Sequence, residues 1–200
     1  MAEEIPYLPH SFHASIKKTL NMLPLRGAHV TAILHPEDYD LFLLDRPPVP
    51  EAEMISALRW QIRSWIPFPA TEAAIQYFAV PGTHKEKIYV AVSKLETIQQ
   101  WQNQLEELDL RLKQVTIVEL SLAKLLTQGN FRAQDPDQEG YLGLLFQKKV
   151  QLQLLIVHDN QLVLTRAFPA SASFEELGQG IHQSFTYCQG QKQDRSKQLF

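Results

Sequence analysis

The order of its apolar segments most constrains how this 200-residue chain can fold. Short apolar runs that are typical of strands alternate with segments whose apolar residues recur every three or four positions, as in helices that cover a sheet. After an opening strand, the predicted order is strand, helix, strand, strand, helix, strand, which is typical of a layered α/β domain. The predicted strands are 29–34, 39–44, 73–80, 87–92 and 110–118, and the predicted helices are 11–23, 51–66, 95–108 and 119–126.

The last third of the chain has a different pattern. Residues 129–139 (GNFRAQDPDQE) are polar and rich in turn formers, so they are predicted to be a linker. Strands are predicted at 141–146, 150–157 and 161–168, with a tight turn at His158-Asp159-Asn160. Helical spacing from Phe174 to Cys188 follows, and the polar tail after it is predicted to fray. This part is predicted to be an antiparallel meander with one helix.

Charge and composition exclude several classes of protein. The formal net charge is -3 and there is no long basic run, so nucleic-acid binding is not expected. No apolar run approaches the ~18–20 residues of a membrane-spanning helix, and the N-terminus lacks the basic and apolar regions of a signal peptide. The single cysteine, Cys188, excludes an internal disulfide, and the cytoplasm is therefore the expected compartment.

Motifs for catalysis, metals and nucleotides are missing from the sequence. There is no Walker-type loop, no GxGxxG, and no Cys/His cluster with zinc spacing. His10 and His13 lack a third ligand, so we interpret them as exposed side chains. His35-Pro36-Glu37-Asp38 is interpreted as a turn, because Pro and Asp favour turn positions. The sequence thus predicts no enzyme, no metal and no cofactor.

The stretch RWQIRSWIPFP, residues 59–69, raises a question about its tryptophans. Met54, Leu58, Ile62 and Trp65 share one apolar face of the predicted helix, with Ile55 and Ile66, whereas Trp60 falls nearly opposite. Two interpretations stay open. The helix is buried between two layers, as large aromatic side chains usually are, or Trp60 contacts a partner, since Trp and Arg are enriched in interface hot spots. On the second interpretation, the partner-binding residues are Trp60, Arg59, Arg63 and Phe68.

Residues 49–78, VPEAEMISALRWQIRSWIPFPATEAAIQYF, resemble a block of the PilM-like proteins of type IV pilus systems, especially their MSHA-pilus relatives of the MshI type. The family pattern appears here as Pro50, Glu51, Ala57-Leu58, Trp60, Ile66-Pro67-Phe68, Glu72 and Tyr77. Two further matches follow in the expected order. Residues 110–123 resemble the strand and helix that return to the family's first core domain, and residues 175–187 resemble its E-I-x-R-S-L-D-Y helix.

The resemblance implies an α/β, actin-like fold of the ribonuclease H-like group, with an inserted ferredoxin-like subdomain. The first lobe would span residues 1–128, with its core at 11–34 and 110–128 and the inserted subdomain at about 35–109. Residues 129–139 would link it to the start of a second lobe at 140–200. These boundaries follow from the family, in which the insertion interrupts the core of the first lobe.

The resemblance also implies a function. PilM-like proteins are located in the cytoplasm at the inner-membrane face, and on this resemblance the chain is expected to be a non-enzymatic scaffold of pilus assembly. They dock the N-terminal cytoplasmic tail of a PilN-like membrane protein and connect the pilus assembly ATPase to the membrane complex. The tail would add a strand to an exposed sheet edge or enter a groove between subdomains.

The nucleotide site of the actin-like fold has no counterpart in this sequence. That fold holds phosphates with two Asp-Gly turns. The chain begins after the place of the first, it ends before the family's adenosine site, and residues 140–149 (GYLGLLFQKK), at the second place, lack Asp-x-Gly. The chain is therefore expected to bind ATP poorly, as a fragment or as a divergent member. Two alternatives stay open: an actin-like nucleotide-binding ATPase whose missing ends belong to a longer protein, and an unrelated α/β protein-interaction module.

Overall fold

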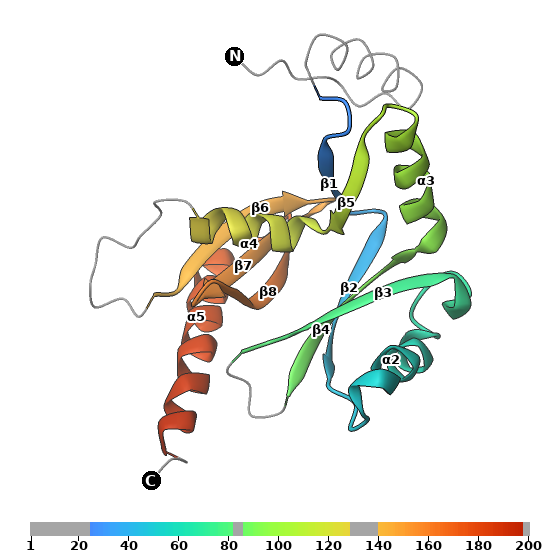
Figure 1. Ribbon diagram of the computed structural model, residues 1–200. Coiled ribbons are helices and arrows are strands. Elements are labelled where there is room, and N and C mark those ends of the chain that lie inside the picture. The colour runs from blue at the N-terminus through green and yellow to red at the C-terminus, as the bar shows by residue number, and fades with distance from the viewer. Residues whose placement is uncertain (1–24, 82–85, 129–139, 198–200) are drawn as a thin grey trace, which may run out of the picture.

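The computed structural model describes residues 25–81, 86–128 and 140–197, and the described strands form three sheets (Figure 1). The predicted helix at 11–23 and the predicted linker at 129–139 lie outside the described residues. A parallel pair joins β1 (His29–Ile33) to β5 (Arg111–Thr116). The other two sheets are antiparallel. One has the order β2-β4-β3 and is built from β2 (Tyr39–Asp45), β3 (Ala73–Ala79) and β4 (Lys87–Lys94). The other is the meander of β6 (Leu142–Lys148), β7 (Gln151–His158) and β8 (Gln161–Pro169).

The sheet β2-β4-β3 is covered on both faces because its middle strand alternates between two cores. Ile88, Val90 and Val92 of β4 point to helix α2 (Met54–Ile62) and are almost fully buried. Tyr89, between them, points to the opposite face, where it packs with helix α4 (Val118–Gln128) and strand β7. Because successive side chains of β4 point to opposite faces, this strand packs on α2 with one face and on α4 and the meander with the other.

The chain from β2 to β5 follows the predicted order of strands and helices. Helix α3 (Leu95–Glu106) leads from β4 to β5, as the ferredoxin-like pattern predicts. In a complete ferredoxin-like unit β5 would be the fourth strand of the sheet. Here β5 pairs with β1, so two segments that the resemblance assigned to one core lie in one sheet. The insertion thus keeps three strands, and its last element returns to the sheet from which the chain entered.

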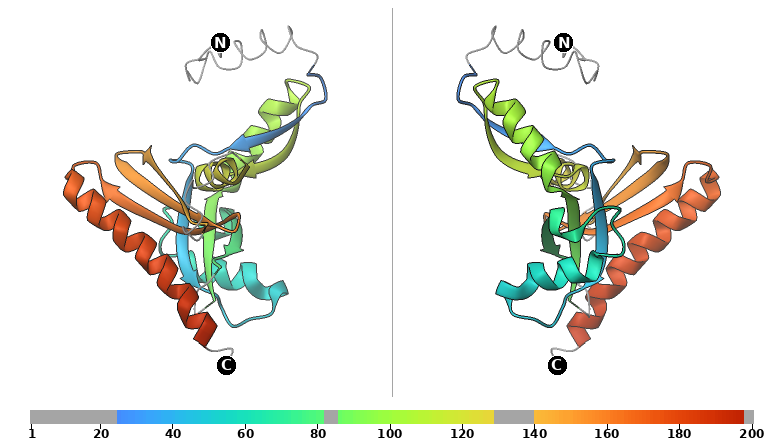
Figure 2. Two further views of the ribbon diagram at one scale, coloured as in Figure 1. Left: turned by 90° about the vertical axis from the view of Figure 1, so that its left-hand side faces the viewer. Right: turned by 90° about the vertical axis from the view of Figure 1, so that its right-hand side faces the viewer.

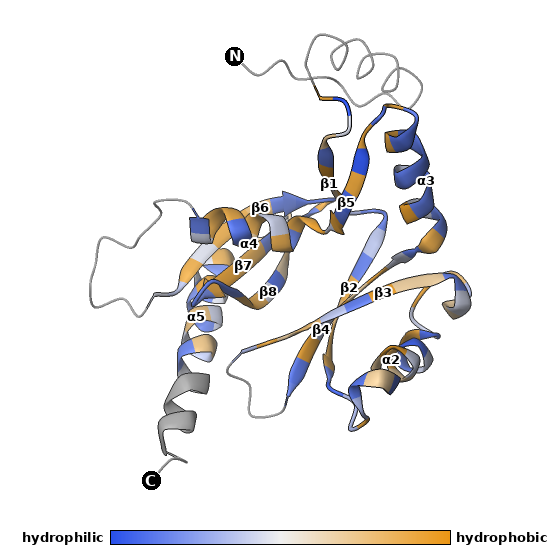
Figure 3. Cartoon of the chain, in the orientation of Figure 1, coloured by the Kyte–Doolittle hydropathy of each residue, from blue (hydrophilic) through white to orange (hydrophobic). Residues whose placement is uncertain are grey.

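The meander β6-β7-β8 also has a middle strand that is buried on both faces. Helix α5 (Phe174–Lys197) lies along the meander on the side away from α4 (Figure 2). Leu154 and Ile156 of β7 pack with α5, whereas Leu155 and Val157 pack with α4. Hydrophobic residues accordingly gather where α4 lies over β6 and β7 (Figure 3). The predicted turn between β7 and β8 is confirmed, since Asp159 and Asn160 have φ values of 48° and 63°, as a type I′ turn requires.

Helix α2 ends earlier than the sequence predicts. A 3-10 turn at Glu51–Glu53 precedes the α-helix, which ends at Ile62 rather than at Ile66. The chain turns there, with the Trp65 N–H bonded to the Ile62 carbonyl. Pro67 disfavours helical backbone at Ile66, the residue directly before it. A second 3-10 turn, Ala70–Glu72, then leads into β3.

The tail prediction was also wrong, because α5 runs as far as Lys197 instead of fraying after Cys188. A helix on a meander needs only one apolar face, and here that face extends from Leu177 to Cys188. The other described strands and helices agree with their predicted positions to within two residues at each end, which is the usual uncertainty of element boundaries.

Candidate functional site

A groove lies where the first parallel sheet meets the insertion. It encloses about 500 Å³ between the end of β1, the turn that follows it, and α3. One side is formed by Ile33, Pro36 and Asp38, the other by Gln100, Trp101 and Gln104, and Val118 at the start of α4 also lines it. We call this the β1–α3 groove. The turn at 35–38 is confirmed, because the Asp38 N–H donates to the His35 carbonyl over 2.9 Å.

The lining of the β1–α3 groove suits an extended peptide. Ile33 is 51% exposed beside the partly buried ring of Trp101, which gives the groove apolar surface. Gln100 and Gln104 are exposed and lie one turn apart on α3, so their amide groups can bond peptide backbone. The outer edge of β1 carries no strand among the described residues, so a ligand can also pair with it.

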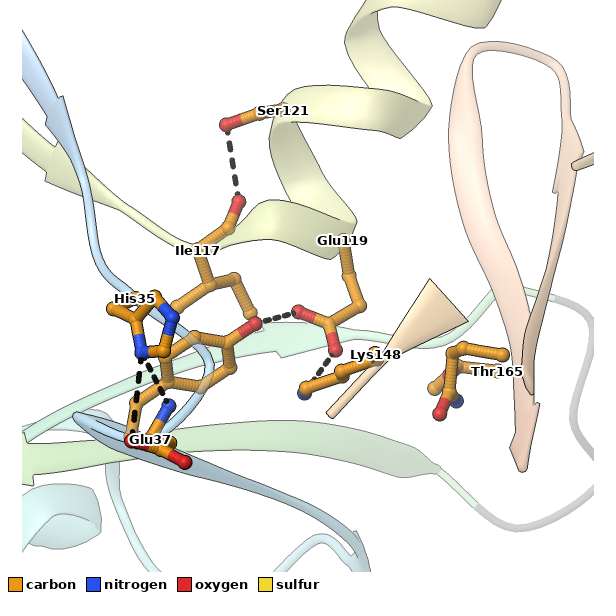
Figure 4. A network of polar contacts seen from close by, with 9 residues as sticks. His35, Glu37, Ile117, Glu119, Ser121, Lys148 and Thr165 are labelled. Atoms are coloured by element: carbon orange, nitrogen blue, oxygen red, sulfur yellow. Dashed lines mark hydrogen bonds and ion pairs between the residues drawn. The ribbon is translucent and has the colours of Figure 1, made fainter. Parts of the chain in front are cut away.

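A buried polar network adjoins the groove and joins three parts of the fold (Figure 4). Glu119, in the first turn of α4, is 1% exposed. The Tyr39 hydroxyl of β2 donates to one of its carboxylate oxygens over 2.5 Å, and the Lys148 ammonium of β6 contacts the other. Asp38 and Val118 line the groove. Tyr39 and Glu119 directly follow them in the sequence, so the network links the walls of the groove to the meander.

Its surroundings keep the Tyr39 hydroxyl of this network protonated. Burial is the main cause that raises the pKa of Tyr39, and the hydrogen bond to Glu119 raises it further, so the phenol stays neutral and donates its proton. The Lys148 ammonium also lies 4.4 Å from the centre of the Tyr39 ring, a cation–π contact. Glu119 thus holds a cation and a neutral donor at once.

A second cavity, of about 380 Å³, lies between β2 and the meander. Lys149, Gln153 and Thr165 line it beside the network. The Tyr89 hydroxyl accepts from the Thr165 N–H over 2.9 Å, which fixes β8 against the inserted sheet. This contact and the network both tie the insertion to the meander.

The four residues predicted from the sequence to bind a partner do not lie on one surface. Trp60 is 68% exposed and Arg63 is exposed beside it, so the interpretation that Trp60 is buried between two layers was wrong for the described chain. α4 and the meander cover the face of the inserted sheet that lies away from α2, so α2 keeps a free outer face. Trp65, predicted on the apolar face, is half exposed, because the helix ends before it reaches that position.

Arg59 and Phe68 have roles in the fold. The Arg59 guanidinium donates to the Ala73 carbonyl over 3.2 Å and thereby fixes α2 to the start of β3. Phe68 is half-buried against the core under α2. Of the predicted set, the structure brings together Trp60 and Arg63 alone.

Sequence reasoning did not find the β1–α3 groove or the Glu119 network. Their residues are dispersed, and Tyr39 and Glu119 are 80 positions apart. The available signal was a carboxylate that alternates with the apolar residues Val118, Leu120 and Leu122, a stretch that the sequence predicts only as the start of a helix.

The described residues hold no group of three or more His, Cys, Asp or Glu side chains that could bind a metal ion. Nor does any helix among residues 25–81, 86–128 and 140–197 have the length and apolar character needed to cross a membrane.

Comparisons with known proteins support the fold. No family model matches the chain, and no curated protein matches its sequence. The structure of the PilM-PilN type IV pilus biogenesis complex is similar over 93% of this chain and 55% of its own, with a TM-score of 0.62 and 18% identity. The cytoplasmic domain of EpsL, an inner membrane component of the type II secretion system of Vibrio cholerae, is similar over 78% of this chain and 56% of its own, with a TM-score of 0.51 and 13% identity.

These two structures confirm the fold that the PilM-like resemblance implied. The chain has an actin-like, mixed α/β fold, and it spans about half the length of the structures it matches. At identities of 18% and 13%, the likeness concerns the fold, and what these relatives bind is a property of those proteins.

Proposed function

We propose that the chain is a scaffold of type IV pilus assembly, of the MSHA-like kind, that docks the N-terminal cytoplasmic tail of a PilN-like inner-membrane protein. One observation carries the proposal: 93% of the chain shares its fold with the PilM-PilN complex. The resemblance of residues 49–78 to PilM-like proteins supports it independently, because that resemblance rests on sequence. On this proposal the chain works in the cytoplasm, at the membrane through its partner, and the pilus assembly ATPase is a second candidate partner.

The β1–α3 groove is the docking site that we propose for the tail. Gln100 and Gln104 give it hydrogen-bonding groups, and Ile33 and Trp101 give it apolar surface, a combination that binds extended peptides. It also lies at the junction of insertion and core, so that a bound tail contacts both.

We further propose that the chain is not an enzyme. In the segment where the second phosphate turn is expected, Lys148 is engaged by Glu119, and no Asp-x-Gly is present. The Glu119 carboxylate would also repel a phosphate that approached Lys148. Saturable binding of Mg-ATP to the chain would contradict this proposal and favour the ATPase alternative.

A groove-filling variant tests the docking site. Gln104→Trp places a large ring in the groove from an exposed position, and Gln99→Trp places the same ring on α3 outside it. We expect Gln104→Trp to weaken binding of a fluorescent PilN-like tail peptide at least tenfold in an anisotropy titration, with Gln99→Trp unchanged. Equal affinities for both variants would place the tail elsewhere, and no binding to the unaltered chain would count against the function itself.

A further inference from the structure

Trp60 and Arg63, at the end of α2, form an exposed pair that neither the core nor the β1–α3 groove uses. The Arg63 guanidinium carbon lies 4.1 Å from the centre of the Trp60 ring, and Arg63 also donates to the Trp60 carbonyl over 2.8 Å. These two contacts hold a 68% exposed indole and a guanidinium in a fixed relation. A surface that is already ordered loses less conformational entropy when it binds a partner.

The charge of this pair is not balanced within the described chain. Arg63 forms no ion pair with any described residue, and the Trp60 indole N–H has no hydrogen-bond acceptor among them. Two donor groups, one of them charged, therefore face solvent beside a large apolar ring. Exposed rings and guanidinium groups with free donors are the side chains that most often dominate protein interfaces.

We propose that this Trp60–Arg63 surface binds a segment of a partner protein that places a carboxylate next to an apolar side chain. The carboxylate would accept from Arg63, which presents several N–H donors in a planar fork, and from the indole N–H of Trp60. The apolar side chain would cover the free part of the Trp60 ring. The surface lies on α2 and the groove on α3, at separate places on the insertion (Figure 1), so it provides a second binding function beyond docking of the tail.

Charge favours a protein partner over an anionic membrane. Glu53 is exposed and lies two turns before Trp60 on the same side of the helical segment. Its carboxylate would face a bilayer that approached along α2, and an anionic lipid surface would repel it. A short acidic segment can contact Arg63 without approaching the acidic start of the helix.

Peptide display with a charge reversal tests the proposal. A library of random ten-residue peptides is selected against the immobilised chain and, separately, against its Arg63→Glu variant. We expect the unaltered chain to enrich peptides with Asp or Glu beside Leu, Phe or Trp, and the variant to enrich Lys or Arg in that place. An identical consensus from both baits would overturn the proposal.

Titrations of one selected peptide complete the test. We expect Trp60→Ala and Arg63→Glu to weaken its affinity at least tenfold, whereas Arg111→Glu, at an exposed arginine of β5, leaves it within twofold. Thermal unfolding shows whether each variant is folded. Equal affinity for all three variants would contradict the proposal, and so would Trp60-dependent sedimentation with phosphatidylglycerol vesicles in the absence of peptide binding. Binding of the PilN-like tail is measured separately, so failure here leaves the docking proposal untouched.

Discussion

At the scale of single residues, removing one member of a buried ion pair destabilises a fold far more than replacing both members with apolar groups. Lys148 is 16% exposed and Glu119 is 1% exposed, so each charge depends on the other. The pair also joins α4 to β6, which belong to parts of the chain separated by residues 129–139. The Glu119 network therefore contributes to the arrangement of the sheets as well as to local stability.

Lys148→Met should expose this dependence. It leaves the buried Glu119 carboxylate without its cation, and we expect the free energy of unfolding to fall by about 3 kcal/mol. The double variant Lys148→Met, Glu119→Leu should recover at least half of that loss, because no charge is left unpaired. Urea denaturation of the single and double variants measures both. A single variant within 0.5 kcal/mol, roughly the spread of neutral surface substitutions, would show that solvent reaches the carboxylate.

The buried thiol of Cys188 should make the stability of the fold depend on pH in the alkaline range. Burial raises the pKa of its thiol from 9.0 to about 11. Between pH 9 and pH 11 the thiol stays neutral in the folded chain, whereas in the unfolded chain it loses its proton from about pH 9. The free energy of unfolding therefore falls as the pH rises through this range. The contribution is fully present below pH 9 and is progressively lost up to about pH 11, and the total loss in the free energy of unfolding is about 2 kcal/mol.

Comparison of the chain with Cys188→Ala isolates this contribution. Between pH 8 and pH 11, the free energy of unfolding should fall by about 2 kcal/mol less for the variant than for the unaltered chain. Burial is also the main cause that raises the pKa of Tyr89, and it acts in both proteins, whereas the charge of Cys188 raises that pKa further only in the unaltered chain. Equal losses would mean that the thiol is ionised in the folded chain.

For Trp60 and Arg63, exposure to a partner was only one of the two interpretations that the sequence allowed. Helical spacing correctly put Trp60 opposite the apolar face, but spacing does not reveal whether a second layer covers that side. It could not assign Arg59 to the Ala73 carbonyl, since that contact joins two elements. The roles of these neighbours differ because of tertiary packing.

At the scale of elements, α5 contains two glycines with opposite requirements. A methyl group at Gly180 would lie 2.3 Å from a ring carbon of the buried Phe168, so Gly180 allows α5 to approach β8 closely. At Gly178, two positions earlier, the same group would meet nothing within 4 Å. The helix packs on the meander at one of these positions and faces solvent at the other.

Alanine substitutions at Gly180 and Gly178 should therefore change the free energy of unfolding in opposite directions. Gly180→Ala is expected to reduce the free energy of unfolding by about 2 kcal/mol through overpacking. Gly178→Ala should increase it by about 0.5 kcal/mol, because alanine favours helix over glycine. Thermal unfolding followed by circular dichroism measures both changes. Stabilisation by both substitutions would mean that α5 does not pack against Phe168 as described.

The identities of the elements were predictable, and some of their ends were not. Period-two and helical patterns are strong in β4, β7 and α3, because each of them packs on at least one core. The end of α2 depends on the turn at Trp65, a backbone contact that the apolar pattern does not register. The extension of α5 to Lys197 is polar, so it had no periodic signal.

At the scale of the whole molecule, the division of the strands among sheets was beyond local reasoning. The order of elements alone allows β5 to join either the inserted sheet or β1. The resemblance assigned residues 110–128 to the same core as residues 11–34, and in the structure β5 pairs with β1. The resemblance to PilM-like proteins correctly implied the actin-like fold. The groove could not be located in the same way, because its two sides come from residues about seventy positions apart, around Ile33 and Trp101.

The account depends on docking of a membrane partner's tail, and one titration tests this most directly. A synthetic peptide of the N-terminal cytoplasmic tail of the PilN-like protein from the same genome is titrated calorimetrically into the folded chain. The account predicts saturable binding near one to one with micromolar affinity or better. An absence of heat at two temperatures, together with an unchanged melting temperature when the peptide is present, would contradict it.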